Sequence, residues 1–152
     1  YGFILDATRN DFVSGEMEKA IVACDQEVKP ELILLEGQSS LRNPSGPCGA
    51  EYLCSAQAKG VILQAAPGRE YFIGQEGISP LPSIASEVEL IKALGADVLA
   101  ITCNSEGVSS IDAIKKQVQT QTDLPVFFPK EEGTDQLIPI VQKFAKEASY
   151  AD

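Results

Sequence analysis

The sequence predicts an α/β fold of three layers, in which a mainly parallel sheet carries helices on both faces. Short apolar runs alternate along the chain with segments of helical spacing, and the runs are residues 32–35, 61–63, 98–101 and 125–128. A run without polar alternation is typical of a strand buried on both faces. Strands that alternate with helices predict parallel pairing through crossover connections. At 152 residues, with no internal repeat or linker, the chain is expected to form a single domain, residues 1–152.

The first half of the chain is expected to hold one long helix, one strand and one short helix. Asn10 and Asp11 are good helix caps, and residues 11–24 then repeat apolar residues with helical spacing. A strand over 32–35 follows, and a loop over 37–49 leads to a short helix over 50–58. Loops of this length in compact domains are commonly functional or disordered.

The second half repeats strand and helix three times. The strand over 61–63 leads into a loop over 65–82, and Ser83 is expected to cap a helix that Gly95 ends. The strand over 98–101 is followed by Asn104, and Ser109 or Ser110 caps the next helix. A strand over 125–128 and an amphipathic helix over 134–148 complete the pattern.

Composition and charge exclude several classes of protein. Hydrophobic residues make up 44% of the chain, and no apolar run approaches the length of a membrane span. The formal net charge of −10 argues against a nucleic-acid surface, because neutralising phosphates takes clustered lysine and arginine. A small anionic ligand stays compatible with this charge if main-chain amides and a cation hold it.

The cysteines and the lack of histidine restrict the chemistry further. The chain contains no histidine, and its four cysteines show no Cys-x-x-Cys spacing. This argues against a zinc site and against a Ser-His or Cys-His nucleophile pair. Cys24 and Cys103 lie in apolar stretches and are expected to be small buried hydrophobes. We therefore interpret the four cysteines as reduced thiols of a cytoplasmic protein.

The candidate site is expected where the strands end. Glu36 follows the strand over 32–35, Gly37 permits a sharp turn, and Gln38 and Ser39 line it with hydrogen-bonding groups. Arg69 follows a Pro-Gly turn, and Asn104 follows the strand over 98–101. Ligands of open α/β sheets bind at the carboxyl ends of the strands, so we expect these side chains to meet over one crevice.

Each candidate also has a purely structural interpretation. In this interpretation Asp11 serves as a helix cap and nothing more. Gln38 and Ser39 then serve only to form hydrogen bonds with the main chain of the loop. Arg69 could be an ordinary exposed charge, and Asn104 an ordinary turn residue. Glu36 has the strongest functional case, because a carboxylate directly after an apolar strand has little structural purpose.

Several segments occur in an order that resembles a known family. They are Asp6-Ala7, the Asp-Phe-Val-Ser-Gly-Glu-Met-Glu segment from Asp11, the Leu-Glu-Gly-Gln-Ser-Ser-Leu segment from Leu35, Pro67-Gly68-Arg69 and Pro80-Leu81-Pro82-Ser83. Together they resemble the carboxy-terminal domain of the D-glutamate N-acetyltransferase family. That family was formerly a domain of unknown function, and some members were labelled NAD-dependent epimerase/dehydratase. The resemblance runs roughly from Asp6 to Pro129.

The resemblance implies a P-loop NTPase-like nucleotide-binding fold, similar to dethiobiotin synthetase. By position it assigns Mg²⁺ to Asp11 and Glu36 and a nucleotide base to Asn104. Arg69 suits an anionic group of substrate or phosphate. The candidate ATP contacts are Gly37, Gln38, Ser39 and Asn104. Mg²⁺ takes one or two carboxylates together with phosphate oxygens and water, which suits such a pair.

The sequence departs from the family in two places. No Gly-x-x-x-x-Gly-Lys-Ser/Thr loop occurs, although the family carries it upstream of the segment that matches Asp6. Tyr71 and Phe72 stand where relatives have histidines near the Pro-Gly-Arg loop. We therefore expect a chain that is truncated at its N-terminus and that binds ATP weakly or not at all by itself.

Three functions follow from these observations. The first is the Mg-ATP-binding domain of an N-acetyltransferase-like or ATP-dependent enzyme of D-amino-acid metabolism, with Glu36, Asp11 and Arg69 as catalytic residues. The second is a non-catalytic assembly module that binds a second copy of the chain or the missing N-terminal part. The third, an NAD-dependent oxidoreductase, is weakened because no Gly-x-Gly-x-x-Gly follows a strand.

Overall fold

The computed structural model describes residues 1–37, 40–46 and 48–148. They fall into two compact units, the N-terminal unit (Tyr1–Ala58) and the C-terminal unit (Lys59–Asp152). Whether the two units make up a single domain stays a prediction. Within the described ranges, no helix is both long and apolar enough to cross a membrane.

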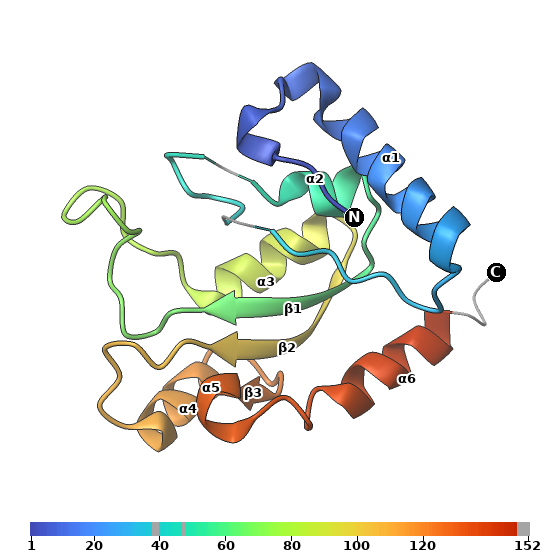
Figure 1. The fold of residues 1–152 in the computed structure, drawn as a ribbon. Helices are drawn as coiled ribbons and strands as arrows, with labels where there is room; N and C mark the ends of the chain where they lie inside the picture. The colour runs from blue at the N-terminus through green and yellow to red at the C-terminus, as the bar shows by residue number, and fades with distance from the viewer. Residues whose placement is uncertain (38–39, 47, 149–152) are drawn as a thin grey trace. The chain divides into compact units, whose positions relative to one another are not determined.

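The C-terminal unit is a parallel three-stranded sheet with helices on both sides (Figure 1). Its strands pair in the order β1-β2-β3 and are β1 (Gly60–Ala65), β2 (Asp97–Cys103) and β3 (Val126–Phe127). Its helices are α3 (Ile84–Ala93), α4 (Ile111–Gln119), α5 (Pro129–Glu132) and α6 (Ile138–Ala148). The α/β class that the sequence predicts is therefore confirmed, and the three apolar runs of this half are all strands.

The core of the C-terminal unit lies around β2 and β3. Ala100, Ile101 and Phe128 are completely buried. β1 and β2 pair from Gly60 opposite Asp97 to Ala65 opposite Cys103, with a register shift after Val61, so their carboxyl ends lie together. At the other end, a side chain at Gly60 would approach the ring of Phe144 to 2.8 Å, so a residue without a side chain lets α6 pack on β1.

Local signals fix three helix ends of this unit where the sequence predicts them, the two ends of α3 and the start of α4. The Ser83 hydroxyl accepts a hydrogen bond from the amide of Ser86, and the Ser110 hydroxyl accepts one from the amide of Ala113. These bonds satisfy main-chain amides that have no partner inside the helix. Gly95 follows α3 with φ +90°, a conformation that favours glycine. The predicted final helix begins later, at Ile138, and α5 was not predicted.

Among its described residues, the N-terminal unit has α1 (Asn10–Val28), α2 (Ala50–Cys54) and a 3₁₀ turn, η1 (Leu5–Ala7). The Tyr1 hydroxyl donates to the Glu27 carboxylate at 2.6 Å and ties the start of the chain to the last turns of α1. The predicted long helix is confirmed, but Asn10 and Asp11 lie inside its first turn. The capping position is Arg9, whose side chain makes no capping hydrogen bond, so the predicted Asn10 or Asp11 cap is wrong.

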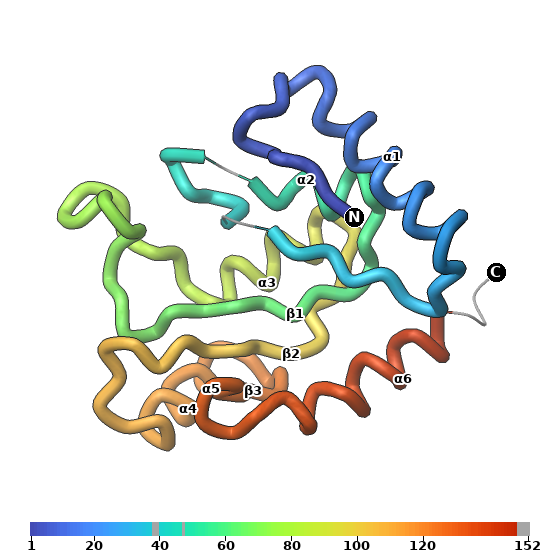
Figure 2. Tube along the Cα trace, in the orientation of Figure 1, coloured from blue at the N-terminus to red at the C-terminus, as the bar shows by residue number. Residues whose placement is uncertain are grey.

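The predicted strand over 32–35 is absent, which is the main correction to the sequence analysis. The chain runs through residues 32–37 without regular secondary structure, and its course can be followed in Figure 2. Leu34 is 81% exposed instead of buried on both faces. A strand exists only where a neighbouring strand completes its hydrogen bonds, and among the described residues none pairs with this segment.

Candidate functional site

The clearest candidate site in the C-terminal unit lies at the carboxyl ends of β1 and β2. The amide of Asn104, directly after β2, donates to the carbonyl oxygen of Ala65 at 2.8 Å and holds the two strand ends together. Arg69 lies just beyond β1, and its amide donates to the carbonyl of Ala66 at 3.0 Å in a tight turn. The sequence placed both residues at strand ends, and the sheet brings them to the same edge.

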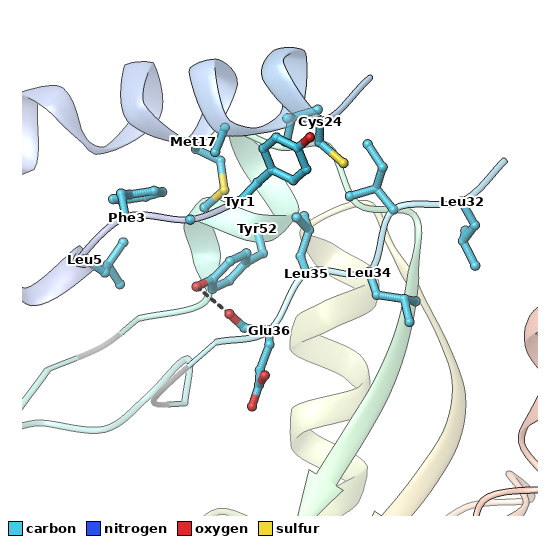
Figure 3. A pocket seen from close by; sticks show the side chains of 14 residues that line it. Tyr1, Phe3, Leu5, Met17, Cys24, Leu32, Leu34, Leu35, Glu36 and Tyr52 are labelled. Atoms are coloured by element: carbon cyan, nitrogen blue, oxygen red, sulfur yellow. Dashed lines mark hydrogen bonds between the residues drawn. The ribbon is translucent and has the colours of Figure 1, made fainter. Parts of the chain in front are cut away.

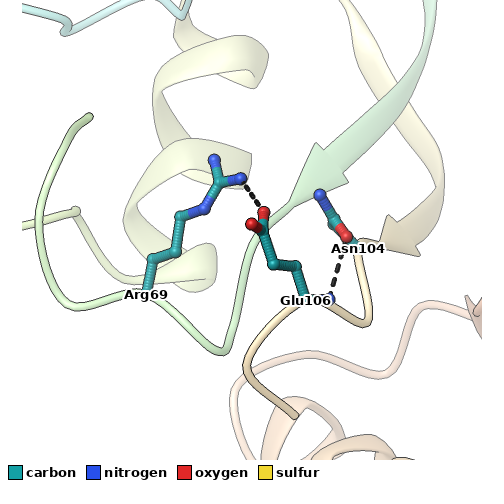
Figure 4. A network of polar contacts seen from close by, with 3 residues as sticks. All are labelled: Arg69, Asn104 and Glu106. Atoms are coloured by element: carbon teal, nitrogen blue, oxygen red, sulfur yellow. Dashed lines mark hydrogen bonds and ion pairs between the residues drawn. The ribbon is translucent and has the colours of Figure 1, made fainter.

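Glu106 connects these two residues. Its carboxylate forms an ion pair with the Arg69 guanidinium, and its amide donates to the Asn104 side-chain oxygen at 2.9 Å (Figure 4). The Arg69 side chain is 32% exposed and that of Glu106 is 67% exposed, so solvent reaches the pair. Glu106 was not among the residues predicted from the sequence, although it stands two residues after a strand-end asparagine and just before Gly107, a typical turn position.

Two glycines allow the loops that carry this network to touch. A side chain at Gly68 would collide with the main chain of Glu106 and Gly107. Gly107 has φ +74°, and a side chain there would lie 3.0 Å from the carbonyl oxygen of Gly68. Close main-chain approach therefore requires glycine on both sides and sets the separation of Arg69 and Glu106.

The chemistry available at this edge is anion binding. A guanidinium offers a planar fork that matches a carboxylate or a phosphate. One nitrogen of the guanidinium already contacts the Glu106 carboxylate, so an incoming anion must exchange with Glu106 or share the cation with it. The adjacent Cys103 is buried, and burial raises the pKa of its thiol to about 11. This thiol is protonated at neutral pH and is a poor nucleophile.

The N-terminal unit contains a pocket of about 300 Å³ lined mainly by apolar side chains. It is formed by the start of the chain, by α1, by residues 32–36 and by Tyr52 (Figure 3). The Tyr52 hydroxyl donates to the main-chain carbonyl of Glu36 at 3.1 Å. The Glu36 carboxylate points away from the apolar side chains of the pocket and is exposed (Figure 3).

Several carboxylates of the N-terminal unit lie near Tyr52 and Cys48. Burial raises the pKa of Tyr52, and the nearby Cys48, Glu51 and Glu36 raise it further. Burial also raises the pKa of Cys48, and Glu51 and Asp6 add to this effect. Burial is the larger cause of both shifts, and the nearby carboxylates of Glu36, Glu51 and Asp6 add to it.

The remaining predicted site residues lie in the N-terminal unit or outside the described part. Asp11 is exposed in the first turn of α1. Gly37 lies against Tyr52, whose ring a side chain at position 37 would approach to 2.8 Å. Gln38 and Ser39 lie outside the described residues. The described residues contain no group of three or more His, Cys, Asp or Glu side chains able to hold a metal. The predicted meeting of Glu36 with Arg69 and Asn104 stays a prediction.

Comparisons with known proteins identify the family. Residues 1–138 match the family described as a domain of unknown function, DUF1611_C, P-loop domain. A solved structure of a DUF1611 family protein from Anabaena variabilis ATCC 29413 is similar to this chain, with 21% identity and a TM-score of 0.81. That match covers 94% of this chain and 44% of the solved chain, so this chain spans less than half of its length. No functionally curated protein matches. The chain therefore belongs to the DUF1611 family, and residues 1–138 correspond to its carboxy-terminal P-loop domain.

Proposed function

We propose that this chain is the Mg-ATP-binding part of a cytoplasmic enzyme that resembles D-glutamate N-acetyltransferases. Arg69 receives a phosphate or carboxylate group, Asn104 contacts the nucleotide, and Asp11 and Glu36 hold Mg²⁺. The acyl transfer rests on the family resemblance alone. The observation that carries the nucleotide-binding role is the gathering of Arg69, Asn104 and Glu106 where two parallel strands end.

Asp11 and Glu36, both exposed in the N-terminal unit, are the carboxylates proposed to hold a hydrated Mg²⁺ ion. Mg²⁺ keeps several waters and needs only one or two protein carboxylates beside the phosphates, so a cluster of three acidic groups is not required. Glu36 is exposed, and its main-chain carbonyl accepts a hydrogen bond from the Tyr52 hydroxyl. The Ser40 hydroxyl is buried and has no hydrogen-bond partner among the described residues, so a bound nucleotide or water could satisfy it. Mg²⁺ bound there would neutralise phosphate charge.

The proposal is tested by titrating ATP into the intact protein with and without Mg²⁺, and by titrating NAD in parallel. Arg69→Ala should weaken ATP binding by about tenfold to a hundredfold, because a hydrogen bond to a charged group contributes about 1.5–3 kcal/mol. Arg9→Ala is the matched control, since Arg9 is an exposed arginine before α1. Residues 1–152 alone should bind ATP weakly, because their sequence lacks a Walker loop.

Equal ATP affinity for the Arg69 variant and wild type would contradict the role of Arg69. Tighter binding of NAD than of ATP would favour the oxidoreductase alternative. The metal assignment is tested separately with Glu36→Gln, which should lower Mg²⁺-dependent turnover by orders of magnitude. Unchanged turnover in that variant would remove Glu36 from the metal site.

A further inference from the structure

The segment over residues 32–36 has the apolar sequence of a strand but no neighbouring strand among the described residues. It follows Pro30 and ends at Gly37. Among the described residues, its main chain makes one recorded hydrogen bond, from the Tyr52 hydroxyl to the Glu36 carbonyl. An unpaired stretch of amides and carbonyls is a template for pairing with another strand.

Its side chains are those of an interior strand. Leu32 is 39% exposed, Leu34 is 81% exposed and Leu35 is 36% exposed. An unbroken apolar run of this kind is typical of a strand with neighbours on both sides and helices on both faces. Contiguous exposed apolar residues mark interaction surfaces in proteins.

Most of the large apolar side chains that are either buried or exposed in the N-terminal unit are exposed. Only Val13, Met17 and Leu53 are buried apolar residues among its described positions. Its exposed large apolar side chains outnumber them and are Tyr1, Ile4, Phe12, Val22, Val28, Leu32, Leu34 and Leu35. The pocket that residues 32–36 line continues the same apolar surface.

Charge argues against a second copy of this chain as the occupant. Glu31 and Glu36 flank the apolar run, and both are exposed. Antiparallel self-pairing would set Glu31 against Glu36, and parallel self-pairing in register would set each glutamate beside its copy. Like charges opposite one another destabilise a strand pair, and a net charge of −10 on each copy adds repulsion. An incoming strand with lysine or arginine at its ends would instead complement both glutamates.

The similar solved chain suggests where such a strand comes from, because this chain covers only 44% of its length. We propose that residues 32–36 are the docking edge for a β-strand of the same polypeptide, from outside residues 1–152. That strand carries apolar residues flanked by basic ones. It completes the hydrogen bonds of residues 32–36 and covers Leu34.

Hydrogen exchange in the intact protein, followed by mass spectrometry, tests this docking. The amides of residues 32–36 should exchange at least a hundredfold more slowly than in an unstructured peptide. Leu34→Asp should then accelerate exchange across the segment and lower the melting temperature by several degrees. Ile73→Asp is the matched control, because Ile73 is 74% exposed in the C-terminal unit, and it should change neither quantity.

Two results would overturn the proposal. Fast exchange at 32–36 in the intact wild-type protein would mean that no strand docks there, whatever the variants do. Slow exchange that disappears on dilution, together with a dimer in light scattering, would identify a second copy as the occupant. Slow exchange in a monomer supports a strand of the same chain.

Discussion

Replacing Gly68 by alanine is a direct test of the contact between the two loops at the candidate site. The new methyl group would lie 2.9 Å from the main-chain carbon of Gly107 and closer still to the carbonyl oxygen of Glu106. Optimal carbon–carbon contacts are about 3.5–4.0 Å, so the loops must separate by roughly 0.6 Å or more. Overpacking of this kind costs about 1–3 kcal/mol. For a chain of 152 residues this corresponds to a fall in melting temperature of roughly 2–10 °C.

Thermal unfolding followed by circular dichroism measures this change. Gly15→Ala is the control, because no atom lies within 4 Å of a side chain at that position in α1. Alanine there should stabilise the helix by about 0.5–1 kcal/mol, so the two substitutions should act in opposite directions. If Gly68→Ala melts within 1 °C of wild type, the loops after β1 and β2 do not touch as described.

Three further predictions concern the C-terminal unit. Phe128→Ala should lower the free energy of unfolding by about 3–5 kcal/mol in urea denaturation, because the ring is completely buried. Hydrogen bonds from Lys115 and from the amide of Phe128 lower the pKa of Glu132. Its stabilisation is therefore present above the pKa of the unfolded state and is lost as the pH falls through the folded pKa. The melting temperatures of wild type and Glu132→Gln should differ by roughly 1–3 °C at pH 7 and converge once the pH has fallen below the lowered pKa of the folded state. Cys103, with a pKa of about 11, should resist alkylation at pH 8 in the folded protein, while the exposed Cys54 reacts. Mass spectrometry measures the labelling of each cysteine, and equal labelling rates would contradict this prediction.

The sequence predicted those parts of the fold that depend on neighbouring residues. Ser83 and Ser110 cap helices because each hydroxyl reaches an amide three residues later. Gly95 ends a helix because of its own backbone conformation. The strand runs at 61–63 and 98–101 became β1 and β2, since each finds its partner inside the same unit.

The errors arose where the outcome depends on distant residues. Leu32 to Leu35 has the composition of a buried strand, but composition does not supply a hydrogen-bonding neighbour. Arg69 and Asn104 could be placed at strand ends from the sequence, whereas their link through Glu106 depends on two loops that meet in space. The Cys24 thiol was expected to be buried like Cys103, yet it is only partly covered and lines the pocket of the N-terminal unit.

The contact between the Phe144 ring and Gly60 affects the choice of the C-terminal boundary when this domain is expressed. The family match stops at residue 138, where α6 begins. A clone designed on that limit would delete the ring that shields the first residue of β1, together with the contacts of α6 to β2. It would expose the amino-terminal end of β1 to solvent, so an expression boundary for this chain is better drawn beyond the last turn of α6 than at residue 138.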